Sequence, residues 1–328
     1  RIIEPLSKIG CTFYPKGKTT LPLTIEGTSM PLAQKHNETL GSAQVKSAIL
    51  LAGLGAEGET VIVPLVKRII QGENLKGLPN IWYKDKTGDI VRAPLSPIID
   101  IDKLPRFNVA PYEESRFWRA MSGEVYKMFP VETHRGCPLK CTFCNSPLQN
   151  ETYKEQTGTT YFRGRKISEV MKDIKYFIEE CGAEYLFFWA DHFFTYSKKE
   201  IDEFCEMYTD IKLPFLIQTR AETMTPYRAK KLKEVGCHRM SLGLEHGNFE
   251  YRKKLLKKGF SNYLMINATK KISEADIPLT INNIIGLPDE TRELIFDTIN
   301  LNRLLIFDTN NCQQIILAKT ILNKIYNY

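Results

Sequence analysis

The chain has 328 residues, of which 43% are hydrophobic, 25% charged and 11% aromatic, and 45 Lys and Arg against 38 Asp and Glu give a net charge of +7. This composition excludes a disordered or collagen-like chain. The charge occurs in short clusters such as residues 252–258, which are typical of a solvated surface, so no nucleic-acid partner is expected. No apolar run reaches the roughly 18 residues of a membrane helix, and we expect a cytoplasmic protein without a membrane span.

The first 63 residues contain three predicted elements. Residues 21–27 and 59–63 are apolar runs that predict strands. Between them, Ser42 can cap a helix whose apolar positions repeat at helical spacing: Val45, Ala48, Ile49 and Ala52. The segment is therefore expected to be a small α/β unit, although about 60 residues bury little surface by themselves.

This segment is similar to enolpyruvylshikimate-3-phosphate synthase, the 3-phosphoshikimate 1-carboxyvinyltransferase of the shikimate pathway. The resemblance implies that Ser42, Ala43 and Gln44 contact shikimate 3-phosphate at the start of the helix, where backbone N–H groups favour an anion. It covers about one structural unit of that enzyme, so we expect a fragment that does not catalyse. A shikimate-pathway transferase fragment is one alternative for the function.

Three of the eight cysteines, Cys137, Cys141 and Cys144, form a C-x3-C-x2-C loop. A disulfide would leave one of them unpaired and would require an oxidising compartment. A zinc site usually needs four protein ligands, and only His134 is available as the fourth. An iron–sulfur cluster usually takes four cysteines, so three leave one iron free to bind a substrate or cofactor. We favour the iron–sulfur cluster, then zinc, then the disulfide.

The spacing, with Phe143 directly before the last cysteine, resembles the cluster loop of the radical S-adenosylmethionine (SAM) superfamily. The resemblance implies that Cys137, Cys141 and Cys144 hold a [4Fe-4S] cluster whose fourth iron binds SAM, with Phe143 among the cofactor-binding residues. The reduced cluster would cleave SAM to a 5′-deoxyadenosyl radical for methylation, cyclisation or rearrangement of an unknown small molecule. The implied partner is an electron donor such as flavodoxin or ferredoxin; a zinc-binding interaction module is the other alternative.

Strands and helices alternate after the cysteine loop. Six strands are predicted over residues 128–133, 184–189, 215–219, 238–244, 279–285 and 312–317. Helices are predicted between them over residues 168–181, from a capping box at Ser197, from an N-cap at Thr225, up to about residue 257, and over residues 261–275 and 290–304. Because parallel strands need such crossovers, the alternation predicts an α/β fold, a partial (β/α)6 TIM-like barrel.

Polar residues follow four of these strands, at the ends where α/β proteins collect their sites. The superfamily resemblance implies that Asp191, Gln218, Arg220 and Glu245 contact SAM and that Gly286 lies along its adenine. Asp191 stands where many relatives have a Gly-Gly-Glu motif. Two histidines near these ends are expected to be structural, His192 and His246.

Residues 81–85 with a turn at residues 86–89, followed by residues 99–105, resemble the connector that joins a cobalamin-binding domain to the barrel in one subgroup of the superfamily. The chain lacks the Asp-x-His-x-x-Gly ligand motif of that domain, so cobalamin binding by this polypeptide is in doubt. The predicted domains are a synthase-like fragment (1–63), a connector (64–122) and a radical SAM core barrel (123–328). Both chain ends resemble the cut ends of a longer protein.

Overall fold

The computed structural model describes residues 12–14, 24–26, 62–84, 88–307 and 312–318. The chain divides into two compact units, Arg1–Ile98 and Ile99–Tyr328, each of which is described by itself. The boundaries expected near residues 63 and 122 rest on resemblance and stay predictions. The expected helix that begins at Ser42, with Ala43 and Gln44, lies outside the described residues.

The described part of the first unit consists of two antiparallel strand pairs and a helix. β1 (Thr12–Tyr14) pairs with β2 (Thr24–Glu26), and β3 (Trp82–Lys84) pairs with β4 (Ile90–Arg92). β2 falls within the strand predicted over residues 21–27, and β3 and β4 lie on either side of the turn predicted at residues 86–89. The helix α3 (Ile62–Gln71) contributes to a small apolar core formed by Leu65, Leu78 and Ile81.

The prediction of a strand over residues 59–63 is wrong for residues 62 and 63, because α3 begins at Ile62. Pro64 lies in the first turn of this helix, where backbone N–H groups have no intrahelical partner, so its missing N–H costs no hydrogen bond there. Leu65 is buried against Leu78 and Ile81. A short apolar run does not by itself distinguish a strand from a buried helical turn.

The second unit is built on a seven-stranded sheet in the order β13-β12-β11-β10-β9-β6-β5. β5 (Trp118–Met121) runs antiparallel to β6, and all the other neighbouring strands are parallel. The parallel strands are β6 (Glu124–Glu132), β9 (Tyr185–Trp189), β10 (Phe215–Thr219), β11 (Cys237–Glu245), β12 (Leu279–Ile285) and β13 (Cys312–Ala318). Their order across the sheet follows the chain, as in an open α/β barrel, which confirms the predicted partial barrel.

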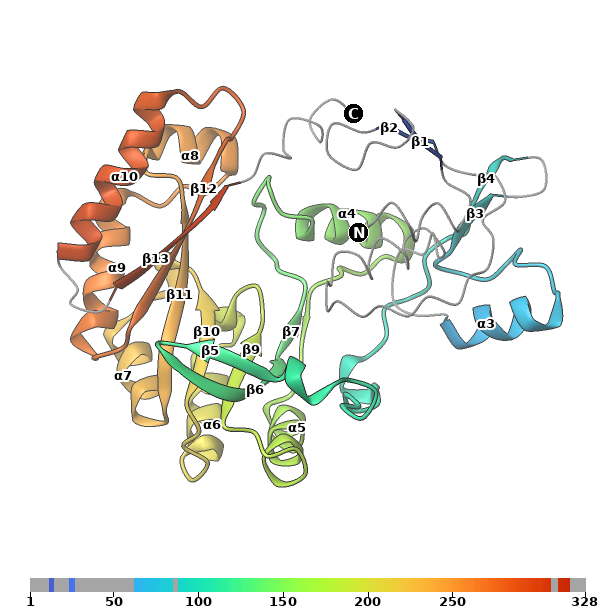
Figure 1. Ribbon diagram of the computed structural model, residues 1–328, viewed down its shortest axis with the longest axis horizontal. Helices are drawn as coiled ribbons and strands as arrows, with labels where there is room; N and C mark the ends of the chain where they lie inside the picture. The colour runs from blue at the N-terminus through green and yellow to red at the C-terminus, as the bar shows by residue number, and fades with distance from the viewer. Residues whose placement is uncertain (1–11, 15–23, 27–61, 85–87, 308–311, 319–328) are drawn as a thin grey trace. The chain divides into compact units, whose positions relative to one another are not determined.

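Helices connect the parallel strands and line the outer side of the curved sheet (Figure 1). They are α5 (Ile167–Glu179), α6 (Lys198–Tyr208), α7 (Pro226–Glu234), α8 (Phe249–Leu256), α9 (Asn262–Glu274) and α10 (Arg292–Phe307). The capping box at Ser197 and the N-cap at Thr225 form as predicted. The helix α4 (Ser146–Thr157) and the hairpin strand β5 were not predicted.

The core between helices and sheet is mainly aromatic. Phe188 on β9 makes edge-on ring contacts with Phe193, Phe204 and Phe215, whose centroids lie 5.2–5.4 Å away. All four rings are fully buried. Buried aromatic pairs of this geometry add to the free energy gained from area burial. This packing holds the strands rigidly, and the site is built on their carboxyl ends.

Candidate functional site

The cysteine loop lies between the short strand β7 (His134–Arg135) and α4, and its start requires glycine. Gly136 has φ +76°, and a Cβ there would lie 2.9 Å from a ring carbon of Tyr161. Asn150 on α4 donates to the carbonyl of Cys137 at 2.7 Å and accepts from the N–H of Phe162 at 2.9 Å. These contacts fix the backbone on which the first thiol is carried.

The far end of the loop is attached to α8, more than a hundred residues later in the chain. The Thr142 hydroxyl donates to the carbonyl of Leu255 at 2.5 Å, and the Thr142 N–H donates to the carbonyl of Leu256 at 3.4 Å. The loop therefore spans from the first strand of the barrel to the helix after β11.

The three cysteines line a cavity of about 180 Å³ together with side chains from β10, β11 and β12 and the residues that follow β9. Of the residues predicted to bind the cofactor, Phe143, Asp191, Gln218, Arg220 and Glu245 line this same cavity. Gly286 does not line it; its N–H instead donates to Glu290 at 2.6 Å. The fold therefore brings together eight of the predicted site residues from four separate parts of the chain.

Arg220 places a positive charge beside the cysteines. Its Nη1 lies 3.0 Å from Cys141 Sγ, and its Nε lies 3.2 Å from both carboxylate oxygens of Glu222. Burial works against the charge of both partners, but their mutual hydrogen bonds raise the pKa of Arg220 and lower that of Glu222. Both groups are therefore charged at neutral pH, and the guanidinium donates a hydrogen bond to the Cys141 sulfur.

Ser146, at the start of α4, joins the cysteine loop to Asp191. Its hydroxyl donates to Asp191 Oδ2 at 3.2 Å, and its N–H lies 3.5 Å from Cys144 Sγ. Ser146 is buried and was not predicted as a site residue. The sequence signal was its place two residues after the last cysteine.

Lys258 is the other site residue that sequence reasoning missed. It is buried, and its Nζ donates to the carbonyl of Gly243 at 2.6 Å and to Glu245 Oε1 at 3.2 Å. A Cβ at Gly243 would lie 2.3 Å from that carboxylate oxygen, so only glycine leaves room for the pair. Glu245 has φ +67°, in the left-handed region that is uncommon outside glycine.

The basic cluster at residues 252–258 was expected to be solvated surface, and this expectation is wrong for its first and last residues, Arg252 and Lys258, which are buried. Arg252 is fully buried, and its Nη2 donates to the carbonyl of Phe260 at 2.6 Å and to Asn262 Oδ1 at 2.9 Å. Burial lowers its pKa to about 10. Charge spacing alone could not reveal this, because the partners lie beyond the helix that carries Arg252.

The histidines near the site are structural in their contacts. His134 packs between the rings of Phe162 and Tyr196 and does not line the cysteine cavity. His192 lies 3.1 Å from the hydroxyl of Thr219, and His246 lies 3.1 Å from Glu290. Burial lowers the pKa of His134 and of His192 to about 4, so both are neutral at pH 7.

The donors present suit an iron–sulfur cluster better than one metal ion. Among the described residues, no three His, Cys, Asp or Glu side chains converge on a single ion position. A [4Fe-4S] cluster does not require the ligands to converge on one ion position, because each thiolate binds a different iron. Three thiols, the Arg220 charge and the carboxylates of Asp191 and Glu245 fit a cluster on three cysteines with a cationic amino group bound nearby.

The sequence profile of the Radical SAM superfamily matches residues 131–301, more than half of the chain. The chain belongs to the radical SAM superfamily. The match includes the cysteine loop, the residues that follow β9 and the strands β10 to β12, all of which contribute to the cavity. Radical SAM proteins are enzymes that use a [4Fe-4S] cluster and SAM, and this chain carries both sets of candidate ligands in one cavity.

Two kinds of sequence relative match different parts of the chain. An uncharacterized methyltransferase of Pyrococcus horikoshii is 28% identical over 247 residues, 74% of this chain and 50% of the relative. A 3-phosphoshikimate 1-carboxyvinyltransferase of Paracoccus denitrificans is 46% identical over 63 residues, 19% of this chain and 14% of that enzyme. The chain thus spans about half the length of the methyltransferase relative, and the resemblance to the shikimate-pathway enzyme is confirmed as a short one.

Solved structures share the fold. The radical SAM methyltransferase TsrM of Kitasatospora setae, determined with cobalamin and a [4Fe-4S] cluster, superposes with a TM-score of 0.58 at 17% identity, covering 82% of this chain and 52% of TsrM. The cobalamin-dependent radical SAM enzyme OxsB superposes with a TM-score of 0.56 at 17% identity, covering 75% and 35%. Within the described residues, no helix has the length and apolar character to cross a membrane.

Proposed function

We propose that the chain cleaves SAM reductively at a [4Fe-4S] cluster held by Cys137, Cys141 and Cys144, and that the reaction so started is a methyl transfer. The observation that carries the proposal is the single cavity in which the three thiols meet polar side chains from successive strand ends. Methyl transfer is supported by the names of the Pyrococcus relative and of TsrM, both methyltransferases. Cyclisation and rearrangement are the other classes.

In this proposal, each polar side chain of the cavity has a role that follows from its charge. The reduced cluster supplies the electron that breaks a carbon–sulfur bond of SAM. Arg220 stabilises the negative charge of the Cys141 thiolate, and the carboxylates of Asp191 and Glu245 attract the amino group of SAM. Gln218 offers an amide to the ribose hydroxyls. Phe143 covers the cavity with an apolar face.

The test is anaerobic reconstitution with iron and sulfide, followed by dithionite and SAM. We expect 5′-deoxyadenosine as a product and about four irons per chain. The triple change Cys137→Ala, Cys141→Ala and Cys144→Ala should remove the iron and the product, whereas Cys181→Ala, a cysteine that does not line the cavity, should change neither. Unchanged iron in the triple variant would overturn the cluster assignment, and a loaded chain that yields no 5′-deoxyadenosine would overturn SAM cleavage.

The match to the shikimate-pathway enzyme favours a second candidate function, the binding of shikimate 3-phosphate by Ser42, Ala43 and Gln44. Calorimetric titration with shikimate 3-phosphate tests it, with Ser42→Ala and Gln44→Ala as variants that should abolish binding. Absence of heat with the unaltered chain would contradict it. The electron donor, flavodoxin or ferredoxin, stays a proposal.

A further inference from the structure

A second cavity, of about 500 Å³, lies in the second unit and shares no lining residue with the cysteine cavity. It is formed by residues 101–107 of the connector, the strands β5, β6 and β9, and the second half of α5. Two of its residues stand just before site residues along the chain: Arg135 is two residues before Cys137, and Trp189 is two residues before Asp191. The cavity therefore adjoins the strand ends that carry the cluster loop.

The cavity lies beside a part of β6 that has a strand partner on one side only. Among the described strands, β5 pairs with β6 only over the first four residues of β6, and Met128 to Glu132 have no strand partner other than β9. The N–H of Met128 still donates to the carbonyl of Phe117 at 2.7 Å, so the unpaired edge begins after it. Pro130, which has no N–H to donate, lies within this open edge, as prolines in sheets usually do. The free edge of β6 leaves a hollow whose wall includes Met128, Pro130 and Glu132.

Large aromatic rings are exposed in this hollow. Trp189, on β9, is 60% exposed, and Phe107, in the connector, is 40% exposed. Phe188, the neighbour of Trp189 on β9, is by contrast fully buried. Phe187, Met128 and the connector residues Ile101 and Leu104 complete an apolar lining. A cavity of this size with exposed aromatic walls and a few polar groups is typical of sites for small organic molecules.

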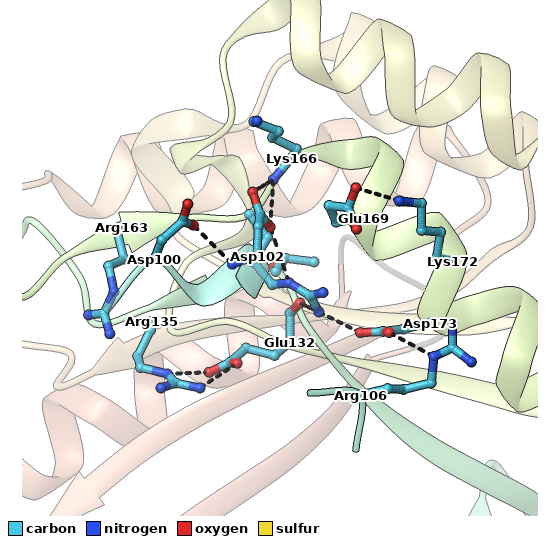
Figure 2. Close-up of polar contacts among 12 residues, drawn as sticks. Asp100, Asp102, Arg106, Glu132, Arg135, Arg163, Lys166, Glu169, Lys172 and Asp173 are labelled. Atoms are coloured by element: carbon cyan, nitrogen blue, oxygen red, sulfur yellow. Dashed lines mark hydrogen bonds and ion pairs between the residues drawn. The ribbon is translucent and has the colours of Figure 1, made fainter. Parts of the chain in front are cut away.

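The lining is also positively charged, with four arginines and two acids. Three of the arginines are held by acids, and Figure 2 labels two of them, Arg106 and Arg135. Arg135 binds both carboxylate oxygens of Glu132 at 2.7 and 2.8 Å, Arg165 Nη1 lies 2.6 Å from Asp173, and Arg106 Nε lies 3.5 Å from the other oxygen of Asp173. Both lining acids are therefore already neutralised by lining arginines.

The fourth arginine, Arg119 on β5, differs from the other three. Its side chain is exposed, and no acid of the described residues forms an ion pair with it. A guanidinium presents parallel N–H groups that match a carboxylate or a phosphate in two hydrogen bonds. Arg119 is thus a cationic group of the lining that a ligand can use without breaking an existing pair.

We propose that this cavity binds a flat aromatic organic anion, with its ring against Trp189 and Phe107 and its carboxylate or phosphate on Arg119. Its role as the substrate site rests on the proposed function, but binding itself requires neither the cluster nor SAM. The neutralised acids and the net positive lining exclude an aromatic cation as the favoured ligand.

The test titrates four probes against the full chain by calorimetry and by quenching of tryptophan fluorescence, before and after cluster reconstitution. 2-Naphthoate and 2-naphthyl phosphate are flat anions of the two chemistries, 2-naphthamide is a neutral isostere, and cyclohexanecarboxylate is an anion without an aromatic ring. We expect one anion or both to bind at least about tenfold tighter than the amide, since charge-assisted hydrogen bonds contribute more than one factor of ten. The anion that binds more tightly, 2-naphthoate or 2-naphthyl phosphate, shows whether the cavity prefers a carboxylate or a phosphate.

Two variants and a control separate the contributions. Arg119→Gln should weaken the naphthyl anions about tenfold and leave 2-naphthamide unchanged, and Trp189→Leu should weaken all three naphthyl probes and remove the quenching. Arg303→Gln, an exposed arginine on α10, should change nothing. Equal affinities in Arg119→Gln and Arg303→Gln, or no binding of any naphthyl probe, would overturn the proposal. Either result leaves 5′-deoxyadenosine formation untouched, so the proposed function is judged separately.

Discussion

At the scale of single residues, glycines set the geometry of the cysteine loop and its surroundings. Gly136 and Gly158 have nearly the same backbone angle, φ +76° and φ +77°, yet their surroundings differ. A Cβ at Gly136 would meet Tyr161 at 2.9 Å, whereas a Cβ at Gly158 would have no atom within 4 Å. The two positions therefore separate the cost of a left-handed backbone from the cost of a collision.

We predict that Gly136→Ala lowers iron binding and that Gly158→Ala does not. Both changes should cost about 1 to 2 kcal/mol of unfolding free energy from the left-handed backbone, and Gly136→Ala should cost about 1 kcal/mol or more beyond that, because Tyr161 must move. The measurements are urea unfolding and iron per chain after reconstitution. Equal iron content in both variants would show that the contact with Tyr161 does not position the loop.

At the scale of elements, buried charges attach the connector to the barrel. The short 3-10 helix η1 (Ile101–Lys103) buries Ile101, and its Asp102 lies 3.6 Å from Arg165 Nε. Arg165 also bonds Asp173 on α5 at 2.6 Å and the carbonyl of Glu132 at 3.3 Å. One guanidinium thus joins the connector, the first parallel strand and the helix α5.

We predict that Arg165→Met lowers the unfolding free energy by about 3 kcal/mol, because it removes an ion pair from each of two largely buried carboxylates. The side chains of Arg165, Asp102 and Asp173 are only 11%, 13% and 15% exposed. Arg106→Met, which removes a 44% exposed partner of the same Asp173, should cost less than about 1 kcal/mol. Urea unfolding measures both, and similar losses in the two variants would contradict the prediction.

At the scale of the whole molecule, two neutral histidines lie buried in the barrel unit. Burial holds the pKa of His134 and of His192 at about 4, against 6.5 in an unfolded chain. Below pH 6.5 the unfolded chain therefore binds protons that the folded chain does not. Stability is complete above pH 6.5 and falls as the pH falls from 6.5 toward 4.

We predict that the iron-free chain loses about 2 kcal/mol per histidine between pH 7 and pH 5. Urea unfolding at the two pH values measures the loss, and His192→Gln should reduce it by the share of one histidine, about 2 kcal/mol, because residue 192 then takes up no proton on unfolding. A loss in His192→Gln as large as in the unaltered chain would show that His192 already carries a proton in the folded state.

Much of the barrel was predictable because its signals are local. Each buried parallel strand is a continuous apolar run, and each helix has caps and an apolar face within a few residues. The strand β10 and the start of α6 match their predicted positions residue for residue. β5 and α4 escaped prediction because neither has a distinctive apolar pattern: β5 is largely exposed, and α4 buries only Ser146 and Tyr153.

The sequence by itself determined the cysteine loop and the order of strands and helices, because these features follow from short-range spacing. The family resemblance added six predicted cofactor residues, five of which line the cavity. Only the tertiary structure decided that Lys258 is buried against Glu245, that Ser146 reaches Asp191 across 45 residues of chain, and that Gly286 stays outside the cavity. It also decided that Arg119 and Trp189 line one hollow. Burial and ion pairing depend on contacts between segments that are far apart in the sequence, and those contacts form only when the barrel packs.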